Sequence, residues 1–136
     1  MLRELSLSTL ALIGLVTAVS AQQAHGAIGT WKAQALLGPK DSVVVTYSFT
    51  VATEGKTATI EFPNRDPIPG RVTVLAGDSI VVDAGPYPSS LKPGLTVTSF
   101  RTVAHVKGDT MTGHFVADYS NGEVHKGKIK ATRVKS

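Results

Sequence analysis

Three histidines and one aspartate are the residues whose types could support metal or acid–base chemistry. His105, His114 and Asp118 lie in one alternating stretch, and His125 follows it. Imidazole is a common zinc ligand, but a zinc site needs three or four converging ligands. On an extended strand Asp118 stands about 13 Å from His114, so no third ligand joins the two histidines. We expect no metal site, with weak surface binding by His105 and His114 as the alternative.

Nucleophilic catalysis is not indicated either. The chain has no cysteine, which excludes thiol nucleophiles, disulfides and thiolate zinc sites. No serine lies in a Gly-x-Ser-x-Gly elbow, a motif that requires a strand-to-helix turn. We expect no catalytic residue and no cofactor. The alternative is a small barrel enzyme acting on a lipophilic substrate, for which His125 and Arg133 are the ionisable residues that point inward.

The first 21 residues predict export. An apolar run from Leu5 to Val19 follows Arg3 and ends in Val19-Ser20-Ala21, which is typical of a cleaved signal peptide and short for a membrane span. Removing these 21 of 136 residues leaves 115, enough for one domain over residues 22–136. We expect a secreted or periplasmic protein with no stable membrane anchor.

The net charge does not indicate a nucleic-acid partner, whereas a local row of lysines could bind an anionic partner. The formal net charge of +4 is too small to argue for nucleic-acid binding. Lys126, Lys128 and Lys130 form an alternating row. This row fits either a patch for anionic lipid or polysaccharide, or a solvated strand face that discourages edge pairing.

The elements that must position these residues are strands. After the signal, Val, Thr, Ile and aromatic residues recur at alternate positions between Gly, Pro, Asn and Asp. The pattern predicts an all-β domain. The expected strands are Ile28 to Leu37, Ser42 to Thr53, Lys56 to Phe62, Gly70 to Ala76, Ser79 to Ala84, Leu95 to Lys107, Asp109 to Ser120 and Glu123 to Val134.

Short turns predict which residues face each other. A turn at 108–109 places Phe100 opposite Ala117 and Thr102 opposite Phe115, which leaves one face apolar. In the same way, a turn at 54–55 places Phe49 opposite Ile60.

The last hairpin requires a bulge. A two-residue turn at Asn121-Gly122 would bury lysines among apolar residues. A three-residue loop over 120–122, with Gly122 left-handed, instead places Phe115 opposite Gly127 and turns the lysines outward. We therefore predict a structural role for Gly122.

Eight sequential strands with short connections favour a closed sheet. An open sheet would leave two exposed edges, whereas an eight-stranded antiparallel up-and-down barrel leaves none. A sandwich is the alternative, but the order of hairpins gives little sign of the long crossovers it needs.

Gly29-Thr30-Trp31 on the first strand and Arg133 on the last resemble the motif of the calycin barrels, which include the lipocalins, avidins and fatty-acid-binding proteins. The resemblance implies a calycin-like barrel in which Arg133 packs across Trp31, so both are expected to be structural. The second lipocalin motif and a helix after the last strand are absent from the sequence. Because Trp31 is the only tryptophan, a biotin pocket of the avidin kind is not expected.

The interior of such a barrel holds either a ligand or a filled core. We predict an apolar or amphipathic small-molecule ligand, held without chemical change in a pocket with a few polar groups. The expected ligand-binding residues are Tyr47, Phe49, Phe62, Tyr87, Thr98, Phe100, Thr102 and Phe115.

Two proline-rich segments, 63–69 and 85–94, are expected to connect strands near the mouth. Long loops often act as lids or binding loops, and Tyr87 and Leu91 would then cover the opening. The alternatives are rigid surface turns, or loops of a protein-interaction or inhibitor module on a solid barrel.

Overall fold

The computed structural model describes residues 25–135 and consists there of strands and turns without a helix. The segment 1–21, interpreted above as an export signal, lies outside the described residues. The strands are β1 (Gly29–Leu37), β2 (Ser42–Val51), β3 (Thr57–Glu61), β4 (Ile68–Ala76), β5 (Ser79–Ala84), β6 (Tyr87–Pro88), β7 (Thr96–Lys107), β8 (Thr110–Tyr119) and β9 (Val124–Arg133).

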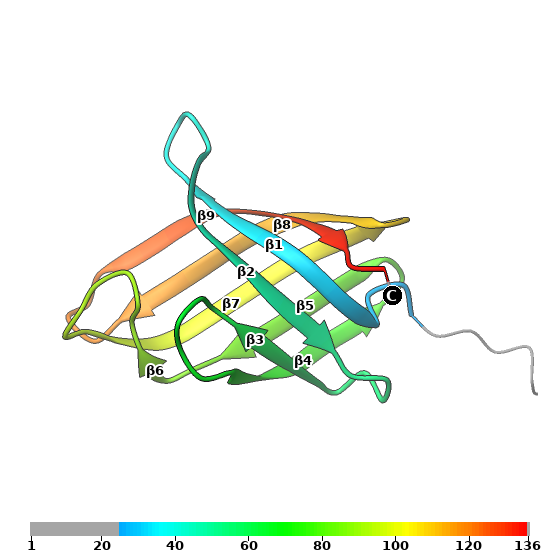
Figure 1. The fold of residues 1–136 in the computed structure, drawn as a ribbon, viewed down its shortest axis with the longest axis horizontal. Helices are drawn as coiled ribbons and strands as arrows, with labels where there is room; N and C mark the ends of the chain where they lie inside the picture. The colour runs from blue at the N-terminus through cyan, green and yellow to red at the C-terminus, as the bar shows by residue number, and fades with distance from the viewer. Residues whose placement is uncertain (1–24, 136) are drawn as a thin grey trace, which may run out of the picture.

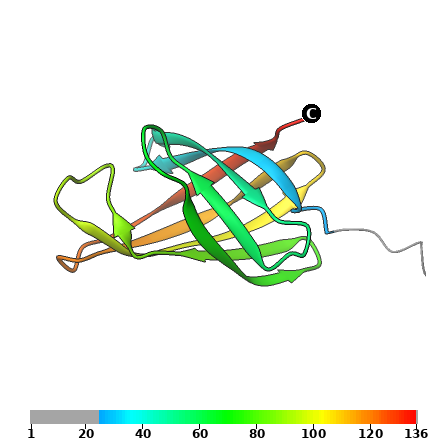
Figure 2. The same ribbon diagram turned by 60° about the horizontal axis from the view of Figure 1, so that its bottom comes forward.

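Eight of these strands form a closed antiparallel barrel, as predicted (Figure 1). Consecutive strands pair with each other, β1 pairs with β9, and β5 pairs with β7 to complete the ring. The two-residue β6 pairs with the first residues of β7 outside this ring. The turned view shows the strands running obliquely around a common axis, as the closure of a twisted sheet requires (Figure 2).

The hairpin registers are confirmed. Phe49 faces Ile60, and Phe100 faces Ala117. In the last hairpin Phe115 faces Gly127, the register that needs the three-residue loop. Gly122 has φ +91° in that loop, a conformation that residues with a Cβ rarely adopt.

At two β-bulges, the side chains that point into the barrel differ from those expected from strict alternation. β1 and β2 shift register between Ala35 and Leu36, so Val43, which strict alternation from Val45 and Tyr47 along β2 would place inside, has 51% of its surface exposed. β7 and β8 shift between Val97 and Ser99. Thr98, expected in the ligand pocket, is consequently exposed, and its hydroxyl donates to the Asp118 carbonyl at 3.1 Å.

The proline-rich segment after β3 is shorter than expected. We predicted an irregular stretch over 63–69, but β4 begins at Ile68, which is buried and pairs with Ile60. Pro69 is compatible with this strand because its fixed φ lies within the range of extended backbone.

The two seams that close the barrel each carry an arginine. At the β1–β9 seam the Arg133 guanidinium lies 4.4 Å from the Trp31 ring centroid and donates to the Ile28 carbonyl at 2.9 Å. At the β5–β7 seam Arg101 donates to both oxygens of Asp83, at 2.7 and 3.1 Å. Both contacts join strands that no short hairpin connects.

Candidate ligand-binding cavity

A layer of aromatic rings divides the barrel interior into two halves. The Phe62 and Phe100 ring centroids are 6.3 Å apart, and those of Phe100 and Phe115 are 5.6 Å apart. These rings come from β7, from β8 and from the residue that follows β3, so the layer crosses the barrel. Tyr47 lies beneath it, 4.9 Å from Phe62 between centroids.

The half that contains Trp31 is filled. Trp31 is fully buried, stacks on Phe49 at 6.5 Å and donates from Nε1 to the Ala27 carbonyl at 2.9 Å. Beneath the aromatic layer lies a void of about 20 Å³. That volume holds about one water molecule, so this void cannot hold an organic ligand.

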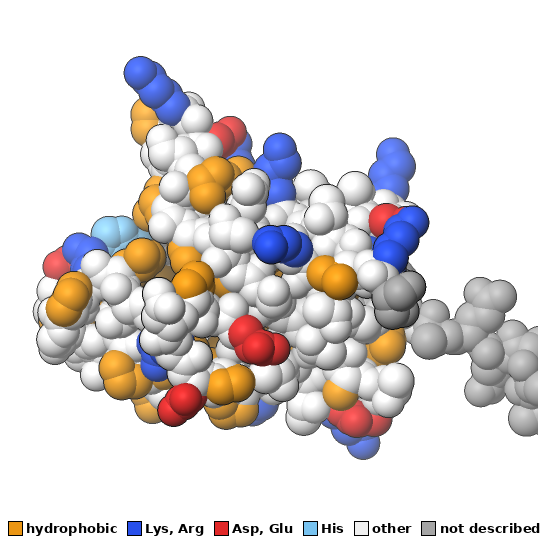
Figure 3. All heavy atoms as spheres, in the orientation of Figure 1, with side chains coloured by type: hydrophobic (Ala, Val, Ile, Leu, Met, Phe, Trp, Pro, Cys, Tyr) orange, Lys and Arg blue, Asp and Glu red, His pale blue; other side chains and the backbone are white. Residues whose placement is uncertain are grey.

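The opposite half contains a cavity of about 250 Å³. Its walls come from the mouth ends of the strands, and apolar side chains gather at this end of the molecule (Figure 3). The lining residues are Ala35, Leu37, Val44, Val45, Phe62, Tyr87, Ser89, Ser90, Leu91, Lys92, Val97, Phe100, Phe115, Ala117, Tyr119 and His125. The body of the cavity is therefore apolar and aromatic, with polar groups confined to its rim.

Gly127 sets the position of the Phe115 ring. A Cβ added at Gly127 would overlap the edge of that ring and the Leu36 carbonyl oxygen. The ring therefore packs directly over the backbone of β9, a close approach that glycine alone permits.

The segment 85–94, here called the strap, borders the cavity and is held at two sides. Arg65 donates to the Pro88 carbonyl and to the Ser90 hydroxyl, the latter at 3.2 Å, and its guanidinium lies 5.1 Å from the Tyr87 ring centroid. On the other side Lys92 Nζ pairs with Glu123 at 2.7 Å. The strap thus connects the 62–67 turn with the β8–β9 hairpin.

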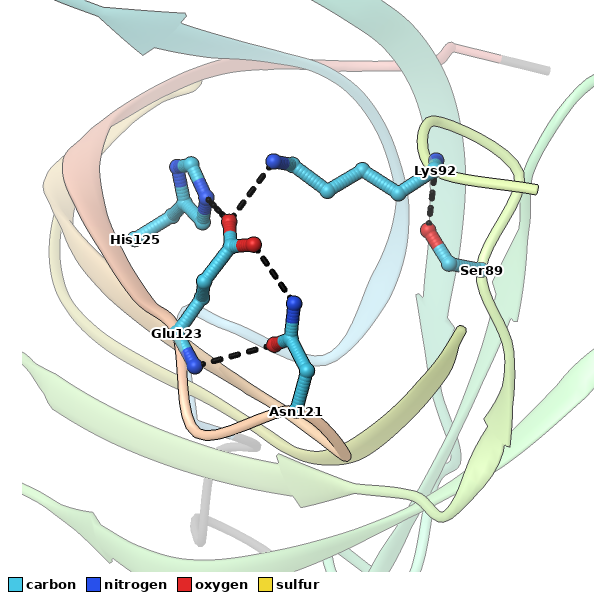
Figure 4. A network of polar contacts seen from close by, with 5 residues as sticks. All are labelled: Ser89, Lys92, Asn121, Glu123 and His125. Atoms are coloured by element: carbon cyan, nitrogen blue, oxygen red, sulfur yellow. Dashed lines mark hydrogen bonds and ion pairs between the residues drawn. The ribbon is translucent and has the colours of Figure 1, made fainter. Parts of the chain in front are cut away.

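Glu123 is the centre of a polar network at the rim (Figure 4). Its Oε1 accepts from Lys92 at 2.7 Å and lies 3.2 Å from His125 Nε2, while its Oε2 accepts from Asn121 at 2.6 Å. These contacts, led by the one with Lys92, lower the pKa of Glu123 to about 2. Glu123 is therefore a carboxylate at neutral pH, and both its oxygens are engaged.

Burial keeps the phenols of Tyr47 and Tyr87 neutral. Burial raises the pKa of Tyr47 well above its ordinary value, and the neighbouring Tyr87 raises it further. Burial likewise raises the pKa of Tyr87, with Tyr119 adding to the effect. Tyr87, which lines the cavity, can orient a ligand by hydrogen bonding but supplies no charge.

The predicted ligand-binding residues fall into three groups. Phe62, Tyr87, Phe100 and Phe115 line the cavity. The others lie elsewhere: Tyr47, Phe49 and Thr102 surround the small void beneath the aromatic layer, and Thr98 points outward.

Sequence reasoning missed part of the lining. Val97 is buried because the bulge beside it exchanges its orientation with that of Thr98. Tyr119, which continues the inward alternation of Phe115 and Ala117, could have been found from that period alone. The position of Lys92 had no local signal because its partner, Glu123, belongs to a distant hairpin.

The histidines considered as surface metal ligands, His105 and His114, lie on the outer face of the barrel. His105 lies 3.1 Å from the Ser79 hydroxyl and 3.5 Å from Asp78, and His114 is exposed one strand away. Within residues 25–135 no group of three or more His, Cys, Asp or Glu side chains could hold a metal ion. In the same residues, no helix is long and apolar enough to cross a membrane.

The barrel is consistent with a calycin-like architecture, but its function has to be argued from the cavity. Comparison of the chain with protein-family models, with curated proteins and with solved structures gave no significant match.

Proposed function

We propose that this protein binds a small apolar or amphipathic molecule in the mouth half of the barrel and releases it chemically unchanged. The observation that carries the proposal is the cavity of about 250 Å³ enclosed by apolar walls and bordered by the strap. Apolar pockets with a few polar groups at one end are typical of small-molecule sites. The export pattern of residues 1–21 supports placing this activity outside the cytoplasm.

The size of the cavity limits the ligand. Water in the liquid occupies about 30 Å³ per molecule, so the cavity holds roughly eight groups of water or methylene size. Burial contributes about 0.8 kcal/mol per methylene, so an eight-carbon chain gains roughly 6 kcal/mol, from which the cost of association is subtracted. Longer molecules would have to extend past the strap.

Binding without chemistry is favoured by the position of the ionisable groups. His125, the inward histidine, lies at the rim with one third of its side chain exposed, and its Nε2 contacts Glu123. The walls below it are hydrocarbon or neutral phenol. A reacting group in the body of the cavity would therefore meet no charged side chain among the residues that line it there.

Uptake of N-phenyl-1-naphthylamine, a neutral apolar fluorophore that is larger than an eight-carbon chain and would extend past the strap, tests the proposal. We expect its emission to rise with the protein and to be reversed by 1-octanol. Ala117→Phe places a ring in the cavity and should reduce uptake at least tenfold, whereas Ala76→Phe, on the exposed end of β4, should not. Ala35→Leu is a second variant that fills part of the same cavity with a smaller side chain, and it should also reduce uptake. Absence of uptake by the folded wild-type protein would contradict the proposal.

A further inference from the structure

We infer that the ligand carries an acidic head group, which binds Lys92 and His125 at the rim while its apolar body fills the cavity. This inference rests on the proposed function, and it names the chemistry that the site selects. Unlike the walls, the rim supplies hydrogen-bond donors from two side chains, Lys92 and His125. Both side chains face the Glu123 carboxylate.

The geometry of Glu123 carries the inference. Lys92 Nζ and His125 Nε2 approach one oxygen atom, Glu123 Oε1, at 2.7 and 3.2 Å. Lys92 and His125 also line the cavity. The rim therefore already holds a carboxylate next to the opening, and Glu123 occupies the place that the carboxylate of a ligand would take.

Lys92 is able to accept a second carboxylate. An ammonium group has three N–H donors, of which Glu123 uses one. Lys92 comes from the strap and reaches toward the β8–β9 hairpin (Figure 4), so its head group lies between the two segments that border the cavity. A ligand anion can bind beside Glu123 or displace it, and in both cases the charge of Glu123 opposes binding.

A cationic head group fits this rim less well. Both Glu123 oxygens already accept hydrogen bonds, from Lys92 and Asn121 among others. The aromatic rings at the rim are approached by cations of the protein itself, since Arg65 lies 5.1 Å from the Tyr87 centroid and Lys92 lies 5.9 Å from that of Tyr119. A ligand cation would find these rings already approached by cations of the protein.

The test compares octanoate, 1-octanol and octyltrimethylammonium, which share an eight-carbon chain and differ in the head group. Each displaces N-phenyl-1-naphthylamine from the full-length protein at pH 7.5 and low ionic strength. We expect octanoate to bind about fivefold more tightly than octanol, the effect of a solvent-exposed ion pair. Octyltrimethylammonium should bind more weakly than octanol.

Substitutions at the rim distinguish the effect of side-chain charge on affinity from the effect of side-chain shape. Lys92→Met should weaken octanoate binding about fivefold more than it weakens octanol binding, and Lys92→Arg should retain the preference for octanoate. Glu123→Gln should strengthen octanoate binding by removing the competing charge. Lys126→Met, an exposed lysine on the same hairpin, is the matched control and should change neither affinity.

Two results would overturn the inference while leaving the proposed function intact. One is equal affinity of the wild-type protein for octanol and octanoate, and the other is an equal loss of both ligands in Lys92→Met. Failure of octanol and the fluorophore to bind at all would instead overturn the proposed function and the inference with it.

Discussion

At the scale of single residues, Arg133 joins three parts of the chain at the closed end of the barrel. Its guanidinium covers the Trp31 ring, donates to the carbonyls of Gly26 and Ile28, and pairs with Asp109 at 3.0 Å. A planar cation that stacks and donates in several directions is required here, which a lysine cannot reproduce. The side chain is only 24% exposed, so these contacts are largely shielded from water.

Arg133→Met should therefore lower the free energy of unfolding by about 2 kcal/mol, from the loss of the cation–π contact and of hydrogen bonds to two carbonyls. Guanidinium chloride unfolding followed by the fluorescence of Trp31 and by circular dichroism measures the change. Lys130→Met, on the exposed face of the same strand, should have little effect. Wild-type stability in Arg133→Lys would contradict the role of the planar guanidinium.

At the scale of elements, the strap depends on contacts at both of its sides. Arg65 holds it to the 62–67 turn, and Glu123 holds Lys92 on the β8–β9 hairpin. Within the strap, the Lys92 amide donates to the Ser89 hydroxyl at 3.0 Å, which keeps Lys92 at the rim. These contacts therefore hold in place a segment that borders the cavity.

The Glu123 contact should depend on pH in a defined direction. The pKa of Glu123 is lowered from its ordinary value of 4.5 to about 2, so the folded state favours the carboxylate. Its stabilisation is present above pH 4.5 and is lost as the pH falls toward 2. The difference in Tm between wild type and Glu123→Gln should be constant from pH 5 to 8 and should vanish in strong acid.

The exposed Glu61 on β3 provides the control for this pH series. The Tm difference between wild type and Glu61→Gln should be smaller across the same range. If the Glu123→Gln difference were equally large at pH 2 and pH 7, the ion pair with Lys92 would not be its cause.

At the scale of the whole molecule, the barrel is neither solid nor empty. The aromatic layer of Phe62, Phe100 and Phe115 separates a filled half, with the seam between Trp31 and Arg133, from the half that holds the cavity. The filled half supplies the burial that a chain without disulfides needs, and the other half holds the cavity. The buried seam and the cavity thus lie at opposite ends of one sheet.

Ligand binding should consequently stabilise the protein without disturbing Trp31. At a concentration of octanol one hundred times its Kd, the added stability is about 2.7 kcal/mol, which raises Tm by roughly 10 °C for a domain of this size. The emission maximum of Trp31, buried beneath the aromatic layer, should not move. Ala117→Phe should abolish the rise in Tm, and a shift of the Trp31 emission would contradict the division into two halves.

The sequence by itself determined the all-β class, the main barrel strands to within two residues at most ends and the hairpin registers, because inside and outside alternate with a period of two and turns fix the pairing. It also pointed to Phe62, Tyr87, Phe100 and Phe115, which line the cavity. It could not place Thr98 or Val43, because each bulge depends on how neighbouring strands coil around the closing barrel.

Only the tertiary structure decided which half of the interior is filled and what stands at the rim. The size of the cavity depends on how rings from three different strands pack against one another and over the backbone at Gly127. The pairing of Lys92 with Glu123 joins residues 31 positions apart in the chain. Such contacts arise from ring closure and side-chain packing, and neither leaves a periodic signal in the sequence.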